Sequence, residues 1–310
     1  MNQNKAVEKK TSLLVKILIF FVVFYIGLTI ESIIQTIFIV ISLFSKMNLK
    51  NIIKILSDSK LFINYIYSST FLTIVTLFST IGIILATIFW CIKIDKHSFE
   101  YMGIKKGNIL KKYGIGLLVG FAMFSSVFIL EIITGCLKID NFNSFSIISI
   151  IIFMLFFFGF VVQSASEEII CRGFLLNNIK SQHGALLGLI ISSLLFSLIH
   201  IFNGGFSIIP FINIFLVGIF FGLYYLCTNS LWGVCAIHGI WNFSQGNIYG
   251  IEVSGISIKN SIINSLQVEG KTLLNGGKFG AEGGLITTSV LIISILILLL
   301  YVKKKKISIK

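Results

Sequence analysis

The sequence predicts an all-α, polytopic membrane protein with about eight transmembrane helices. Hydrophobic residues make up 56% of the 310 residues and charged residues only 12%, which is about half the charged share of a soluble domain. The apolar residues are gathered into runs that approach or exceed the roughly 20 residues a helix needs to cross a bilayer. No shift in composition marks a separate soluble domain.

Eight apolar runs are candidate spans, at 13–44, 62–92, 113–136, 146–170, 185–202, 207–227, 231–248 and 284–302. The first two are longer than a bilayer requires, which predicts tilt or extension into the interface. The polar, glycine-containing stretch 249–281 is expected to be an external loop. We therefore divide the chain into N-terminal helices with a basic loop (1–112), a helical core (113–250), and an external loop with a C-terminal helix (251–310).

Lysine placement predicts the orientation of the chain. Lysines flank the first and last spans, at Lys5, Lys9, Lys10, Lys16, Lys303, Lys304, Lys305 and Lys306. Such lysines mark the cytoplasmic side, and an even number of spans puts both termini there. Segment 46–60 carries four lysines although the count places it outside, and we interpret it as an amphipathic helix on the membrane surface. The abundance of Phe, Ile, Asn and Lys favours a bacterium, and hence its plasma membrane.

Several classes of protein are excluded by composition. The formal charge is +13, but the lysines lie in the tails and between apolar runs, so nucleic acid is not an expected partner. The five cysteines show no paired spacing, which argues against a disulfide framework. The first apolar run is long and has no small-residue cleavage site near its end, which argues against a cleaved signal peptide. The oligomeric state is not predicted.

Ionisable groups inside the spans are the candidates for function, because they are costly in a membrane. Six stand out, namely Glu31, Glu131, Glu167, Glu168, His200 and His238. Glu31 and Glu131 are isolated, which favours a structural role in hydrogen bonding between helices. The other four fall into three patterns with helical spacing.

The first pattern is EEIICR, residues 167–172. Glu168 and Arg172 are four residues apart with the acid first, the favourable order on a helix, and Arg172 is the one arginine in the sequence. Glu167 points about 100° away around the helix. The arginine is therefore expected to hold Glu168 and leave Glu167 available, although an ion pair at the end of a span would look the same.

The second and third patterns are FSLIH, with Phe196 and His200, and HGIWN, with His238 and Asn242. Counting from the turns that precede or follow each helix, Glu167 and His200 lie about 22–26 Å, and His238 about 13 Å, along their helices. These depths agree if the hairpin around 177–184 projects into the cytoplasm. The three patterns are then expected to converge in the inner half of the bilayer.

Such a set of side chains suits hydrolysis. A glutamate can take a proton from water as a general base, and a histidine can position that water. His238 and Asn242 can donate hydrogen bonds to an oxyanion. Alternatively, Glu167, His200 and His238 are a possible zinc set with an open water position, although the HExxH motif is absent. No serine or cysteine has the spacing of a covalent nucleophile.

The patterns match EExxxR, FxxxH and HxxxN, and in order and spacing they resemble the CPBP intramembrane proteases. That family includes CAAX prenyl endopeptidases and bacteriocin-processing and immunity-associated membrane proteins. The resemblance covers residues 113–250, which are then expected to be the catalytic core. It implies an endopeptidase that cleaves peptide or membrane-anchored protein substrates near the cytoplasmic face of the membrane.

By the same resemblance, Glu167 would be the water-activating base, helped by His200. His238 and Asn242 would bind the oxyanion, and Glu168 and Arg172 would support the site.

We favour a mechanism without a cofactor, because each role can be assigned without an ion, and keep the zinc version as the alternative. A non-catalytic immunity protein is a second alternative. A proton- or ion-coupled transporter is disfavoured because no inverted repeat is visible.

Overall fold

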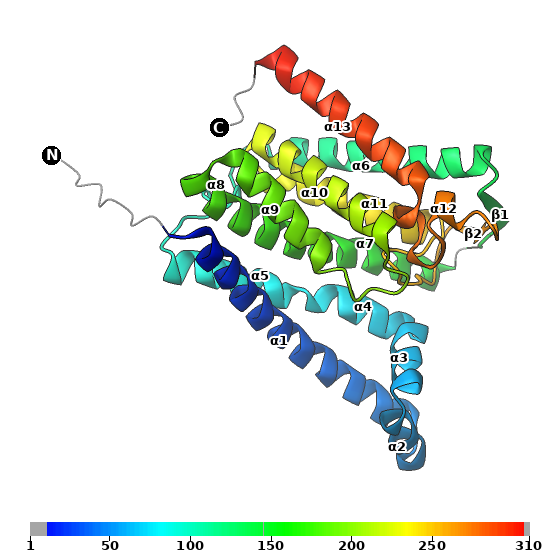
Figure 1. Cartoon of the computed structure of the whole chain (residues 1–310). Helices are drawn as coiled ribbons and strands as arrows, with labels where there is room; N and C mark the ends of the chain where they lie inside the picture. The colour runs from blue at the N-terminus through cyan, green and yellow to red at the C-terminus, as the bar shows by residue number, and fades with distance from the viewer. Residues whose placement is uncertain (1–10, 145, 307–310) are drawn as a thin grey trace.

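The computed structural model describes residues 11–144 and 146–306 as a bundle of helices (Figure 1). The helices are α1 (Leu13–Lys46), α2 (Leu49–Ser57), α3 (Ser59–Ser68), α4 (Thr70–Ser79), α5 (Ile81–Phe89), α6 (Ile109–Ile133), α7 (Ile147–Glu168), α8 (Asn177–His183), α9 (Ala185–Leu198), α10 (Ile208–Thr228), α11 (Leu231–Phe243), α12 (Thr272–Asn275) and α13 (Leu285–Lys305). Wider π-helical segments follow α5, α7 and α11, at Trp90–Ile94, Ile169–Leu176 and Ser244–Ile248. Two strands, β1 (Leu137–Phe142) and β2 (Ile263–Gln267), pair antiparallel.

The expected fold class is confirmed, but the count of eight spans is not. Within the described residues, six helical stretches are long and apolar enough to cross a membrane: α1, Thr70–Ile94, α6, Ile147–His183, α10 and α13. The expected span at 185–202 is the shorter α9, which ends at Leu198 after 14 residues, or about 21 Å of helix. The expected span at 231–248 is α11 with its π-helical continuation.

The lysine-rich segment 46–60 forms the helix that its pattern predicted. Asn48 caps α2 by accepting a hydrogen bond from Asn51 N, and Asp58 ends α2 and caps α3. Both short helices lie at the end of α1 that is farther from the termini (Figure 1). Their position on a membrane surface and the cytoplasmic termini remain predictions, and Lys5, Lys9 and Lys10 lie outside the described residues.

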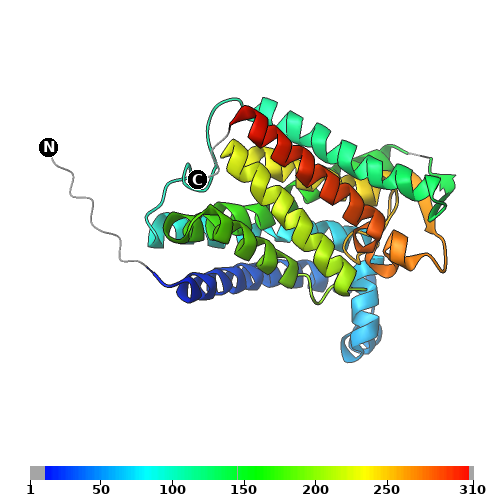
Figure 2. The same cartoon turned by 45° about the horizontal axis from the view of Figure 1, so that its top comes forward.

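The stretch expected to be an external loop, 249–281, has more structure than its polar sequence suggested. It contributes β2, α12 and a 3₁₀ turn, and it covers the end of the bundle opposite the termini (Figures 1 and 2). Its polar groups bond inward, as when the buried Asn275 donates to Cys136 O at 2.9 Å and to Val268 O at 3.2 Å. Phe279, which belongs to this stretch, is fully buried.

Glycines allow the helices of the core to pack closely. A Cβ on Gly116 would collide with the carbonyl oxygen of Gly233, and one on Gly120 with that of Ile237, so α6 and α11 touch backbone to backbone. Gly184 is different: no described atom lies within 4 Å of its Cβ position, and its φ of 91° makes the turn between α8 and α9. Gly184 and Gly188 have the GxxxG spacing that predicts close helix packing, but of the two only Gly188 is in close contact with another segment.

Replacing Gly120 with valine should loosen the contact between α6 and α11. Overpacking of this kind costs about 1–3 kcal/mol of unfolding free energy, because Ile237 and Ile240 leave no room for the side chain. Thermal unfolding in detergent measures the loss. Gly114→Val on the same helix is the matched control, since no described atom occupies the space beside Gly114; equal midpoints for the two variants would contradict the packing.

Candidate active site

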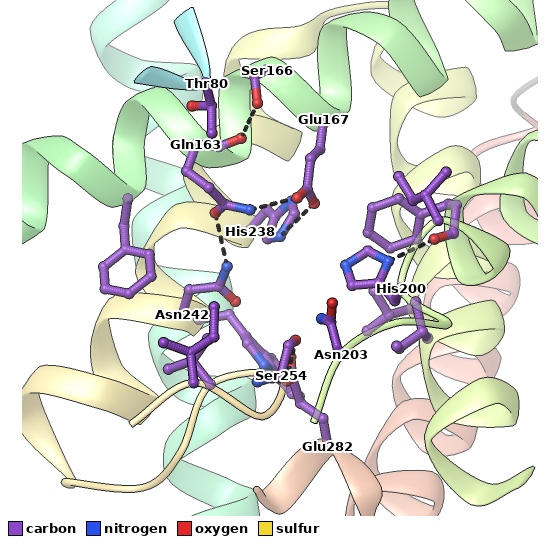
Figure 3. A pocket seen from close by; sticks show the side chains of 18 of the residues that line it. Thr80, Gln163, Ser166, Glu167, His200, Asn203, His238, Asn242, Ser254 and Glu282 are labelled. Carbon is purple, nitrogen blue, oxygen red and sulfur yellow. Dashed lines mark hydrogen bonds and ion pairs between the residues drawn. The ribbon is translucent and has the colours of Figure 1, made fainter. Parts of the chain in front are cut away.

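A cavity of about 310 Å³ lies between the N-terminal helices and the core. Residues of α1, α4 and α5 line it together with residues of α7, α9, α10, α11 and α13. Figure 3 shows several of these side chains. Half of the lining side chains are apolar. The strongly polar ones are Glu31, Gln163, Glu167, His200, Asn203, Asn213, His238, Asn242 and Glu282. Four of the six residues predicted for the site therefore face one cavity.

The other two predicted residues form an ion pair behind the cavity wall. Arg172 Nη1 lies 2.8 Å from Glu168 Oε1, and both side chains are fully buried. Arg172 Nη2 donates to Gly218 O at 3.2 Å, and the guanidinium lies 4.3 Å from the centre of the Phe196 ring, a cation–π contact. The pair expected from the spacing of the two residues is present.

His238 joins this ion pair to the cavity. Its Nδ1 lies 2.9 Å from Glu168 Oε1, and its Nε2 lies 3.7 Å from Glu167 Oε2. Phe221 packs against the ring with centroids 5.0 Å apart. Because Glu168 is a carboxylate paired with arginine, His238 donates from Nδ1, which fixes the ring and turns Nε2 toward Glu167.

A chain of hydrogen bonds holds Glu167 in the cavity. Gln163 Nε2 donates to Glu167 Oε1 at 2.6 Å, and Gln163 Oε1 accepts from Asn242 Nδ2 at 3.1 Å (Figure 3). Glu167 Oε2 is buried and has no hydrogen-bond partner among the described residues. Glu168 Oε2 is also buried without a hydrogen-bond partner, but Glu168 does not line the cavity, so Glu167 is the acid that presents a free oxygen there.

His200 faces Glu167 across the cavity (Figure 3). The spacing from Phe196 predicted that His200 lies on a helix, and this prediction is wrong. His200 lies in the turn that follows α9. Its Nδ1 is 2.7 Å from Phe196 O, so the ring is anchored to the end of α9. This contact leaves Nε2 for a molecule in the cavity.

Residues 148–244 match the family model of the type II CAAX prenyl endopeptidases, Rce1-like. We call this segment the Rce1-like domain, after the family model that it matches. It runs from the start of α7 to the end of α11 and contains all six predicted site residues. The match supports the resemblance to the CPBP proteases. No curated protein and no solved structure matched the chain.

Two motifs of the Rce1-like domain, EEIICR and HGIWN, lie where an α-helix continues as a π-helix. α7 ends at Glu168 and continues as the π-helix Ile169–Leu176, which holds Arg172. α11 ends one residue after Asn242 and continues as a second π-helix, Ser244–Ile248. π-Helical turns are rare in proteins, and those that occur are often found at functional sites.

Several residues of the site were not expected from the sequence. Gln163 precedes Glu167 by four residues, the same spacing that revealed the other patterns, so this signal was available. Ser254 and Glu282 come from the segment after the Rce1-like domain and carry no local signal. Glu31, interpreted as structural, both lines the cavity and accepts from Gln35 Nε2 at 2.9 Å.

Glu131 does not fulfil its expected structural role. It is fully buried, and neither carboxyl oxygen has a hydrogen-bond partner in the described part of the chain. It lies on α6, outside the Rce1-like domain and outside the cavity lining.

The predicted zinc ligands do not form a metal site in this conformation. No three His, Cys, Asp or Glu side chains of the described residues are close enough to hold an ion together. Glu167 and His238 are neighbours, but His200 is on the opposite side of the cavity (Figure 3). His238 Nε2 and Glu167 Oε2 lie 3.7 Å apart, and a mechanism without a metal stays a prediction.

Removing the arginine should destabilise the Rce1-like domain severely. Arg172→Met leaves Glu168 buried without its cation, and breaking a buried pair in this way costs about 3–5 kcal/mol. Unfolding in detergent measures the change. Glu167→Gln is the control, because it leaves the pair intact and should unfold near the wild-type midpoint. A wild-type midpoint for Arg172→Met would show that the pair is not required.

Proposed function

We propose that the chain is an intramembrane endopeptidase in which Glu167 activates water. The observation that supports this most directly is the unpartnered Oε2 of Glu167, which lies in a cavity with His200, His238 and Asn242 on an Rce1-like domain. A carboxylate held by one oxygen and free at the other suits a general base. The match to a family of endopeptidases supports peptide-bond hydrolysis as the reaction.

The first step uses a water molecule between Glu167 and His200. Glu167 Oε2 takes a proton from the water as its oxygen bonds to the carbonyl carbon of the substrate. His200 Nε2 holds the water or the attacked group from the opposite side. Gln163 keeps Glu167 Oε1 in place, so the other oxygen remains directed at the water.

The carbonyl oxygen then carries a negative charge, and His238 and Asn242 are placed to stabilise it. Asn242 Nδ2 now donates to Gln163 Oε1, and a substrate oxyanion would compete for this donor. His238 Nε2 faces the cavity beside Glu167 Oε2, where it can reach the oxyanion. Donors fixed before the reaction stabilise such a charge most effectively.

In the last step Glu167 gives its proton to the amide nitrogen of the substrate, and the C–N bond breaks. The products are a carboxylic acid and an amine, and Glu167 is again a carboxylate. Glu168 and Arg172 do not touch the substrate in this scheme. They hold His238 by its Nδ1, as second-layer carboxylates commonly orient histidines.

The cavity walls indicate the kind of substrate. Phe24, Leu28 and Ile83 come from the N-terminal helices, while Phe160 and Val217 come from the Rce1-like domain. Such walls favour an apolar peptide or the membrane-anchored part of a protein over a soluble polar chain. Cleavage near the cytoplasmic face stays a prediction from the lysines, since Ser254 and Glu282, at the end of the bundle opposite the termini, also line the cavity.

Glu167→Gln should abolish peptide cleavage while the fold is retained. Loss of a general base lowers the rate by about 10²–10⁴-fold. The measurement is cleavage of a set of internally quenched apolar peptides by protein reconstituted in lipid vesicles. Glu131→Gln, which alters a buried acid away from the cavity, should leave the rate unchanged. Equal rates for wild type and Glu167→Gln would refute the assigned base.

The metal-free scheme predicts that activity survives removal of metal ions. Purified protein would be dialysed against a strong chelator, assayed with the same peptides, and analysed for bound zinc. We expect an unchanged rate and far less than one zinc per chain. A loss of activity that added zinc restores would favour the zinc version with Glu167, His200 and His238 as ligands.

A further inference from the structure

Glu282 lies at one end of the cavity. The segment after the Rce1-like domain forms this end, and hydrogen bonds hold Glu282 in place there. Its Oε2 accepts from Ser254 N at 2.9 Å and from Ser254 Oγ at 2.7 Å, and Gln245 Nε2 lies 3.5 Å away. Its main-chain oxygen accepts from Asn213 Nδ2 at 2.7 Å. Three donors on one oxygen leave Oε1 as the part of the carboxylate that is free to meet a ligand.

The charge of the cavity is one-sided. Three carboxylates line it, from Glu31, Glu167 and Glu282, and none of its described lining residues is lysine or arginine. Gln35 engages Glu31 and Gln163 engages Glu167. Glu282 forms no salt bridge with any described residue. A ligand that carries a positive charge would supply the cation that this group of carboxylates lacks.

We infer that Glu282 selects substrates with a basic side chain, lysine or arginine, near the bond that is cleaved. Glu282 lies across the cavity from Glu167 (Figure 3), so the basic residue would flank the scissile bond and would not be part of it. The inference rests on the proposed function. It makes Glu282 a specificity residue, with Ser254 as the residue that positions it.

The test uses internally quenched peptides of one apolar sequence in which a single position carries lysine, Nε-acetyllysine or glutamate. That position is moved along both sides of the peptide. The protein is reconstituted in zwitterionic vesicles, so that charge does not concentrate the peptides on the lipid. At one position wild type should cleave the lysine peptide with a kcat/KM about tenfold above that for acetyllysine, the scale of a charge-assisted hydrogen bond.

Glu282→Gln should remove this preference, so that its kcat/KM values for the lysine and acetyllysine peptides become equal. Glu252→Gln is the matched control, because Glu252 belongs to the same segment but does not line the cavity, and it should keep the preference. Glu282→Lys should favour the glutamate peptide, a gain that misfolding cannot produce. No lysine preference in wild type, or the same preference in Glu282→Gln, would overturn the assignment.

Failure of the proposed function is distinguished by binding. The same peptides, carrying a photo-crosslinking group, are titrated against Glu167→Gln and against the double variant Glu167→Gln/Glu282→Gln. The lysine peptide should bind Glu167→Gln about tenfold more tightly than the acetyllysine peptide, and the double variant should lose the difference. If the lysine peptide binds more tightly but wild type cleaves neither peptide, the protease assignment is wrong and the role of Glu282 stands. If Glu167→Gln binds the lysine and acetyllysine peptides equally well, only the role of Glu282 is wrong.

Discussion

Two opposite charges, Glu168 and Arg172, are buried completely in the bundle with 2.8 Å between Oε1 and Nη1. Moving an ion from water into the protein interior costs several kcal/mol. Only a close partner of opposite charge, together with further hydrogen bonds, offsets this cost. The Arg172 guanidinium is held directly against the Glu168 carboxylate. That carboxylate is what His238 Nδ1 binds. The ion pair therefore fixes the orientation of the His238 ring. That orientation in turn decides that Nε2 is the atom facing Glu167.

The backbone around the pair places the site at the contact of several helices. Arg172 lies in the π-helix that continues α7, and it reaches Gly218 on α10 and Phe196 on α9. Gly116 and Gly120 bring α6 against α11 from the other side. Helix α11 is thus held between α6 and α7, which fixes His238 and Asn242 with little freedom. A proton transfer between side chains needs this precision, because a displacement of 1 Å is enough to slow a reaction greatly.

Apolar runs and four-residue spacing predicted most of this arrangement. The runs identified the helices because a bilayer demands long apolar stretches, and the spacing identified Glu168 with Arg172 because residues four apart share a helix face. The same reasoning missed Gln163, since a neutral amide is unremarkable in a sequence. It misplaced His200, because nothing local showed that α9 ends at Leu198. Ser254 and Glu282 were beyond its reach, because tertiary packing alone brings that segment to the cavity.

The cavity is built from parts of the chain with different tasks. The residues assigned to proton transfer and oxyanion binding all lie within 148–244, the Rce1-like domain. Phe24, Leu28 and Glu31 precede that domain, and Glu282 follows it, yet all four line the same cavity. Phe160 and Val217 of the Rce1-like domain complete the walls. Glu282 therefore offers a way to change the charge that a peptide meets without altering the hydrogen bond between Gln163 and Glu167, because it belongs to a segment far from both in the sequence.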